Sequence, residues 1–210
     1  MTYVQFVLVC EGPTDEDLLE HLRKLLIFVG ADQVVGTTLP IDRLPDHLGR
    51  DVESKLRAAQ LLEPGANLIL VHRDSDSPDP EPRYQEIDDA IQVVQPTCGI
   101  VGIVPVHETE AWLLLDEREI RDVVGNPRGR MNLGLPRPHE VEGVAAPKER
   151  LREALLRASG ATGRRRDRLQ KRLSGLVRQL LLRLPVHGDI ERLPAWTRLR
   201  DDLTDAVAHL

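Results

Sequence analysis

Short apolar runs alternate with longer amphipathic segments through the first 125 residues of the chain. Val4–Cys10, Leu68–Val71 and Gly99–Val104 have the length and composition of buried strands, and a weaker strand is expected at Val34–Thr38. The segments between them repeat apolar residues at helical spacing, and helices are expected at 14–30, 51–62, 83–95 and 108–125. Strands that alternate with helices favour a mostly parallel sheet flanked by helices, so we predict an α/β fold.

The first of these helices has signals at both ends. Thr14 is a good N-cap, and Gly30 suits the end of the helix. Asp15, Glu16 and Asp17 place negative charge in the first turn, where the helix dipole favours it. We therefore interpret these three carboxylates as helix-start charges.

The second half of the chain changes character. Residues 126–147 are rich in Gly, Pro and Arg and are expected to form a loop or linker. Beyond them an apolar stripe runs from Leu169 to Leu184, and a last helix carries Trp196. The predicted organisation is an α/β domain at 1–125, a linker at 126–147 and an all-helical basic C-terminal appendage at 148–210.

The composition narrows the class of protein. A chain of 210 residues can form one substantial domain, and no apolar run approaches the roughly 18 residues of a membrane helix. The first residues lack the features of a signal peptide, so a cytoplasmic location is expected. Cys10 and Cys98 have no CxxC partner, which argues against a disulfide framework or a zinc finger, and both are expected to be buried.

Positive charge is concentrated in one segment of a chain whose net charge is −6. Residues 148–183 hold twelve lysines and arginines against three acidic residues. An acidic body with one basic segment is typical of metal-dependent chemistry on a polyanion, although a solvated helix face would look the same. With only 3% aromatic residues, a nucleic acid would be held by its phosphates. The candidate contacts are Lys148, Arg164, Arg165, Arg166, Arg168, Lys171 and Arg172.

Carboxylates follow three of the predicted strands, at the edge where α/β sheets bind ligands. Glu11 follows the first strand, Asp74 and Asp76 follow the strand at 68–71, and Glu108 and Glu110 follow the strand at 99–104. If the extended geometry persists, Asp74 and Asp76 point to the same side. Oxygen ligands suit Mg²⁺ or Mn²⁺, so these five residues are candidate metal ligands.

Each carboxylate also has a plainer interpretation. Glu11 can bond backbone amides at the helix entry, Asp74 and Asp76 can belong to an exposed turn, and Glu108 and Glu110 can cap the next helix. Within the last pair Glu110 is preferred as a ligand. Asp79 and Glu81 are interpreted as loop charges, and His72 and His107 as neutral, satisfied residues.

Two segments together resemble a known family. "VLVCEG" followed by "LILVHRDSD" resembles the TOPRIM fold of topoisomerases, primases and overcoming-lysogenization-defect nucleases. That resemblance implies Mg²⁺ binding by Glu11, Asp74 and Asp76, close to nucleic-acid phosphates. "VPVHETEAWLLLD" is similar to a segment of small bacterial TOPRIM-like proteins that are often encoded beside an SMC- or ABC-like ATPase, a context that suggests phage defence.

The sequence departs from the TOPRIM pattern in two places. His72 and Arg73 stand before the DxD pair, where TOPRIM strands are usually apolar, and no lysine lies near the acidic motifs in sequence. Lys148 is the candidate to fold back toward them. The leading hypothesis is a Mg²⁺-dependent nuclease with Glu11, Asp74, Asp76 and Glu110 as catalytic residues. The alternatives are a non-catalytic effector that acts through an ATPase partner and, less favoured, a nucleotide-sugar transferase with a DxD motif.

Overall fold

Four parallel strands form the single sheet of the computed structural model, which describes residues 1–12, 15–39 and 51–210. The strands are β1 (Tyr3–Val9), β2 (Gln33–Thr38), β3 (Leu68–His72) and β4 (Gly99–Ile103), in the order β2-β1-β3-β4. Val7 is in register with Ile69, which is in register with Ile100. The predicted α/β class with a parallel sheet is confirmed, while the expected N-cap Thr14 lies outside the described residues.

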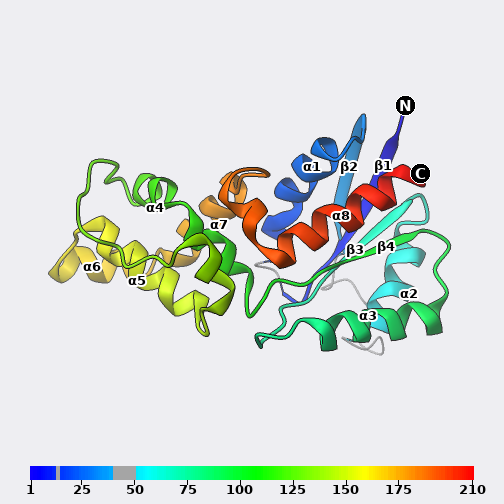
Figure 1. Ribbon diagram of the computed structural model, residues 1–210, viewed down its shortest axis with the longest axis horizontal. Helices are drawn as coiled ribbons and strands as arrows, with labels where there is room; N and C mark the ends of the chain where they lie inside the picture. Colours follow the sequence, from blue (N-terminus) through cyan, green and yellow to red (C-terminus); the bar gives the residue numbers. More distant parts are fainter. Residues whose placement is uncertain (13–14, 40–50) are drawn as a thin grey trace.

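Helices cover both faces of this sheet (Figure 1). The alternation of β1 side chains decides which face each helix covers. Val4, Phe6 and Leu8 share a core with α1 and α8, whereas Val7 and Val9 share a second core with α2 and α3. The α-helices are α1 (Leu19–Phe28), α2 (Val52–Leu62), α3 (Glu81–Val94), α4 (Glu117–Val123), α5 (Pro147–Ser159), α6 (Gly163–Gln170), α7 (Leu173–Arg183) and α8 (Pro194–Ala208). Short 3₁₀ helices are η1 (Asp15–Leu18), η3 (Thr109–Leu115), η4 (Pro138–Gly143) and η5 (Asp189–Arg192).

The segment expected to form one helix at 108–125 is divided in two. It forms η3 and then α4, and the break is at Asp116, whose side chain accepts a hydrogen bond from the backbone N–H of Glu119. Residues Thr109–Leu114 are all buried, so tertiary packing on several sides overrides the one-sided helical pattern. Glu110 is therefore carried on a tight 3₁₀ turn.

The C-terminal helices do not form one separate appendage, and this prediction is wrong for the last of them. Helices α5, α6 and α7 lie away from the sheet, but α8 crosses back over it beside α1 (Figure 1). Trp196 and Leu199 of α8 are fully buried in the same core as β1. The apolar stripe of α8 is thus covered by the sheet, and α5, α7 and α8 share one core with β1 and α1.

Other sequence predictions about the core have clear outcomes. Trp112 and Trp196 are buried in the core as expected, and so is Cys10, but Cys98 is only half-buried. Gly30 ends α1 with φ at 112°, a conformation that favours glycine. Of the helices in the described ranges, none has the length and apolar composition needed to cross a membrane.

Candidate active site

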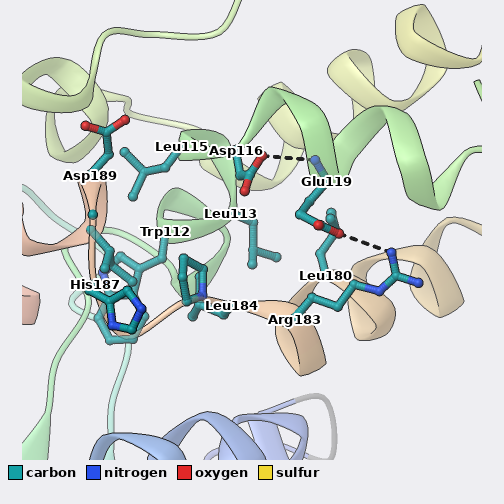
Figure 2. Close-up of a pocket in the computed structure, with 13 residues that line it drawn as sticks. Trp112, Leu113, Leu115, Asp116, Glu119, Leu180, Arg183, Leu184, His187 and Asp189 are labelled. Carbon is teal, nitrogen blue, oxygen red and sulfur yellow. Dashed lines mark hydrogen bonds and ion pairs between the residues drawn. The ribbon is translucent and has the colours of Figure 1, made fainter. Parts of the chain in front are cut away.

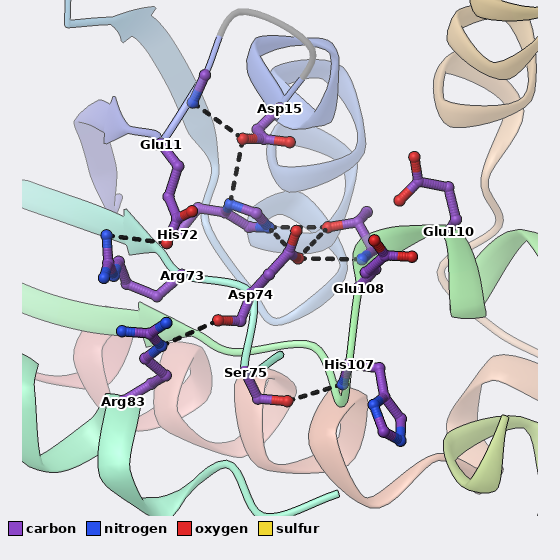
Figure 3. Close-up of polar contacts among 12 residues, drawn as sticks. Glu11, Asp15, His72, Arg73, Asp74, Ser75, Arg83, His107, Glu108 and Glu110 are labelled. Atoms are coloured by element: carbon purple, nitrogen blue, oxygen red, sulfur yellow. Dashed lines mark hydrogen bonds and ion pairs between the residues drawn. The ribbon is translucent and has the colours of Figure 1, made fainter. Parts of the chain in front are cut away.

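The carboxyl ends of β1, β3 and β4 meet at one edge of the sheet and bring the predicted acidic residues together there (Figure 3). Glu11 follows β1, Asp74 follows β3, and Glu108 and Glu110 follow β4. This is the edge where parallel sheets present ligand-binding loops. The sequence prediction that these residues share one region is confirmed.

Asp74 lies at the centre of the site. Its Oδ1 accepts hydrogen bonds from the backbone N–H and the hydroxyl of Thr109, at 3.0 and 3.2 Å. The pKa of Asp74 is raised to about 7, mainly by burial and then by the negative charges of Asp15 and Glu110, while the two Thr109 bonds oppose the rise. The negative charge of this group is therefore poorly compensated, which is the condition that a bound cation relieves.

His72 lies buried between two carboxylates. Its Nε2 is 2.8 Å from the Thr109 hydroxyl and 3.5 Å from Asp74 Oδ1, and its Nδ1 is 3.7 Å from Asp15 Oδ2. Burial lowers the pKa of His72 to about 4, so the ring is neutral at pH 7. Because the Thr109 hydroxyl donates to Asp74, it accepts a hydrogen bond from the Nε2–H of His72. Nδ1 is then a buried lone pair that has no hydrogen-bond partner among the described residues.

Asp15 and Lys55 belong to the site although sequence reasoning did not place them there. Asp15, interpreted as a helix-start charge, begins η1, accepts from the Gly12 N–H at 3.2 Å and faces His72. Lys55 of α2 is buried and donates to the Cys10 carbonyl at 2.8 Å. The signal for Asp15 was its position just beyond a strand end, whereas Lys55 carried no local signal.

Two of the predicted metal ligands form ion pairs with arginines. Arg73 contacts Glu11 at 2.8 Å and Glu86 at 3.1 Å, and Arg83 contacts Asp76 at 2.9 Å. Asp76 has φ at 55°, so the extended geometry on which the same-side expectation depended ends before it. The Asp76 carboxylate is 65% exposed and pairs with Arg83, whereas that of Asp74 is 22% exposed and accepts from Thr109.

A lysine reaches the acidic site from the C-terminal part of the chain. Lys148 Nζ lies 3.6 Å from Glu110 Oε1 and 3.9 Å from Glu108 Oε1, and the Lys148 N–H donates to Glu108 Oε2. Burial raises the pKa of Glu110 while Lys148 opposes the rise, and Glu110 in turn raises the pKa of Lys148. The predicted fold-back of Lys148 is confirmed, and its catalytic role stays a prediction.

A groove of about 400 Å³ begins at Glu110 and Lys148 and continues between α5 and α7. Arg152, one turn after Lys148 on α5, also lines it. The remaining predicted nucleic-acid contacts lie on α6 and just after it, are exposed, and do not line the groove; they are Arg164, Arg165, Arg166, Arg168, Lys171 and Arg172. Figure 1 places α6 at the end of the molecule far from the sheet.

A second cavity, of about 350 Å³, has a different character (Figure 2). Its walls include the buried side chains of Trp112, Leu180 and Ile190. At its rim the polar groups are already paired, since Arg183 contacts Glu119 at 3.1 Å. Its other carboxylates also have partners, since Asp116 accepts from the Glu119 N–H and Asp189 pairs with Arg192, so the strand-end cluster is the stronger candidate for chemistry.

The donor chemistry of the strand-end cluster fits a hard divalent cation. In the described part of the chain no group of three or more His, Cys, Asp or Glu side chains is already arranged around a common point for a metal ion. Mg²⁺, however, commonly uses one or two carboxylates and completes its shell with water and substrate phosphate. Asp74 and Glu110 meet that requirement, and the uncompensated charge at Asp74 favours it.

Comparison with known proteins does not assign a family. No protein-family model matches the chain, and no curated protein or solved structure shows a significant match to it.

Proposed function

We propose that this protein is a Mg²⁺-dependent, TOPRIM-like phosphodiesterase that hydrolyses nucleic acid. The observation that carries the proposal is the half-buried carboxylate of Asp74, whose pKa is raised to about 7 beside Asp15 and Glu110, with Lys148 facing Glu110. Acidic and basic groups that shift one another's pKa at the carboxyl edge of a parallel sheet are typical of an active site.

Asp74 and Glu110 would hold the ion, or Mn²⁺ in its place. A bound Mg²⁺ supplies activation of water and stabilisation of charge on the phosphate oxygens. Thr109 fixes the orientation of Asp74 through two hydrogen bonds. Lys148 and Arg152, at the mouth and along the wall of the groove, would bind the phosphates of the substrate. Glu11 and Asp76 would join the metal shell only by exchanging their arginine partners for the cation.

The test is cleavage of labelled single- and double-stranded DNA and RNA with Mg²⁺, with Mn²⁺ and with EDTA. Asp74→Asn keeps an acceptor for Thr109 but removes the charge, so we expect it to abolish both cleavage and Mg²⁺ binding in calorimetry. Asp89→Asn is the matched control, because Asp89 is an exposed carboxylate on α3 that accepts only from Gln85 in the described contacts. Cleavage that survives EDTA or the Asp74→Asn substitution would refute the proposal.

The ion pairs of Glu11 and Asp76 favour a second candidate, a non-catalytic effector that works with an SMC- or ABC-like ATPase. In that case Arg73 and Arg83 neutralise the acidic edge permanently, and the site is structural. Purification with and without the product of a neighbouring ATPase gene separates the two functions. Metal-dependent cleavage by the isolated chain supports the hydrolase, whereas cleavage by neither preparation supports the effector.

A further inference from the structure

Strand β4 forms one edge of the sheet and leaves part of its backbone unpaired. The Gly99 N–H donates to the Asn67 carbonyl at 3.1 Å, and the Ile103 carbonyl accepts from the Arg73 N–H at 3.0 Å. In a parallel ladder alternate residues face the same neighbour, so Gly99, Val101 and Ile103 bond β3. The N–H and C=O groups of Ile100 and Gly102 consequently face away from the sheet.

In the part of the chain that the structure describes, this edge lacks the features that usually prevent strand pairing. Proteins protect edges with charged side chains, prolines, bulges or a covering segment. The sequence of β4, "GIVGI", contains no charge and no proline, and it pairs with β3 without a bulge. Its outward backbone groups line an open groove of about 440 Å³. The edge is therefore suited to accept another strand.

The two walls of the groove differ in chemistry. Tyr84, Ile87 and Ile91 of α3 supply the apolar part of the wall on one face of the sheet, and Asp88 is the charged residue of α3 that lines the groove beside them. Gly102 of β4 leaves room for the Tyr84 ring to pack against the strand, since a Cβ at position 102 would lie 3.2 Å from that ring. The Tyr84 hydroxyl, in the same wall, is buried without a hydrogen-bond partner.

The opposite wall is acidic. Asp202 and Asp205 of α8 line it, together with Arg198 and, just after the helix, His209. Burial raises the pKa of Asp202, Arg198 opposes that rise, and Asp205 and Asp88 are among the like charges that add to it. Arg198 compensates the negative charge of Asp202 and Asp205 only in part, because its guanidinium also pairs with Glu81 and lies 3.4 Å from the centre of the Tyr84 ring. A basic partner is therefore favoured electrostatically on this side.

We propose that the β4 edge binds an extended segment of a partner protein as a fifth strand, with alternating apolar and basic residues. Successive side chains of a strand point to opposite faces, so the apolar residues contact the α3 wall and the basic residues contact Asp202 and Asp205. A second copy of this edge is a poor occupant, because "GIVGI" brings no positive charge and two acidic walls would face each other.

The experiment uses the full chain and a synthetic peptide of alternating Lys and Val, with an alternating Glu and Val peptide as control. Amide exchange followed by NMR should show protection of the Ile100 and Gly102 amides by the Lys peptide alone, with no change at the already bonded Val101. Asp202→Asn with Asp205→Asn should weaken binding roughly fivefold, as expected for two rim ion pairs. Ile100→Pro removes an outward donor without removing a bond to β3, so it should abolish binding.

Three results would overturn the proposal: no binding of the Lys peptide, equal binding of both peptides, or binding without protection of Ile100 and Gly102. A concentration-dependent dimer that protects these amides without peptide would also overturn it, by assigning the edge to a second copy. Thermal unfolding checks that Ile100→Pro is folded. If it is not, the double variant of Asp202, which is half-buried, and Asp205, which is exposed, still decides the question.

Discussion

At the scale of single residues, the two arginine-bound carboxylates differ in burial and should differ in their effect on stability. Arg73 is 16% exposed and Glu11 34%, whereas Asp76 is 65% exposed. Glu11→Gln leaves Arg73, whose Nε already has no hydrogen-bond partner, with one carboxylate instead of two. We expect it to lower the free energy of unfolding by about 1 kcal/mol, because a partly buried charge loses one of its two counterions. Urea unfolding without divalent cations measures this change.

Asp76→Asn is the comparison for that prediction. Its pair with Arg83 is mostly solvated, and exposed pairs contribute only about 0.5 kcal/mol or less. A smaller effect is therefore expected for Asp76→Asn than for Glu11→Gln. Equal losses would show that the solvent exposure of the two pairs does not set their contributions.

The sequence was sufficient to find Asp74 and Glu110, because strand ends in a parallel sheet meet at one edge. It was not sufficient for the direction of Asp76, which depends on a single positive φ after the strand. Lys55 and Asp15 were missed as site residues, since helix-spacing rules explain them without a site. The sequence does not determine the position of Lys148, because its contact with Glu110 joins segments far apart in the chain.

At the scale of elements, a buried histidine joins three helical segments. His21 of α1 is fully buried; its Nδ1 lies 3.2 Å from the Leu184 carbonyl after α7, and its Nε2 accepts from the Trp196 indole N–H of α8. The indole can only donate, so Nε2 carries no proton and Nδ1 donates to the carbonyl. Protonation of Nε2 would break the contact that holds α8 to α1.

This arrangement predicts acid sensitivity. Burial lowers the pKa of His21 from 6.5 to about 4, so the unfolded chain binds the proton more readily. The contribution of neutral His21 to the free energy of unfolding is complete above pH 6.5. It is lost as the pH falls toward 4, by up to about 3 kcal/mol. Urea unfolding from pH 7.5 to 4 should show this loss, and His21→Gln should flatten the slope even if it lowers stability throughout. An unchanged slope would contradict the assignment.

The elements themselves were predictable where one local signal decided them. The four strands follow from short apolar runs, and the start of α2 follows from Asp51, whose side chain accepts from the Ser54 N–H. The 3₁₀ turn η3 was not predictable, because the residues around Trp112 are buried on all sides and no longer show a helical face. The packing of α8 on the sheet was also not predictable, since an apolar stripe indicates that a helix is buried on one side but not which surface it packs against.

At the scale of the whole molecule, the positive charges of the basic segment are divided between two places. Lys148 and Arg152 line the groove beside the acidic site, whereas Arg164, Arg165 and Arg166 are exposed on α6, at the far end of an elongated molecule (Figure 1). A nucleic acid that reaches both places would release counterions at each. The sequence showed the excess charge but not this separation, which depends on the turn between α5 and α6.

The separation predicts different roles for the two groups of cations in nucleic-acid binding. Replacing Arg164, Arg165 and Arg166 with Gln should weaken nucleic-acid binding. It should also make the negative slope of log K against log salt less steep by about 2 to 3, because each lost phosphate contact removes about 0.7 to 0.9 from its magnitude. Cleavage at saturating substrate should stay unchanged, since α6 does not line the groove. Lys148→Gln with Arg152→Gln should instead reduce both the slope and the cleavage rate. Titrations at several salt concentrations measure the slopes, and an unchanged slope for the α6 variant would confine binding to the groove.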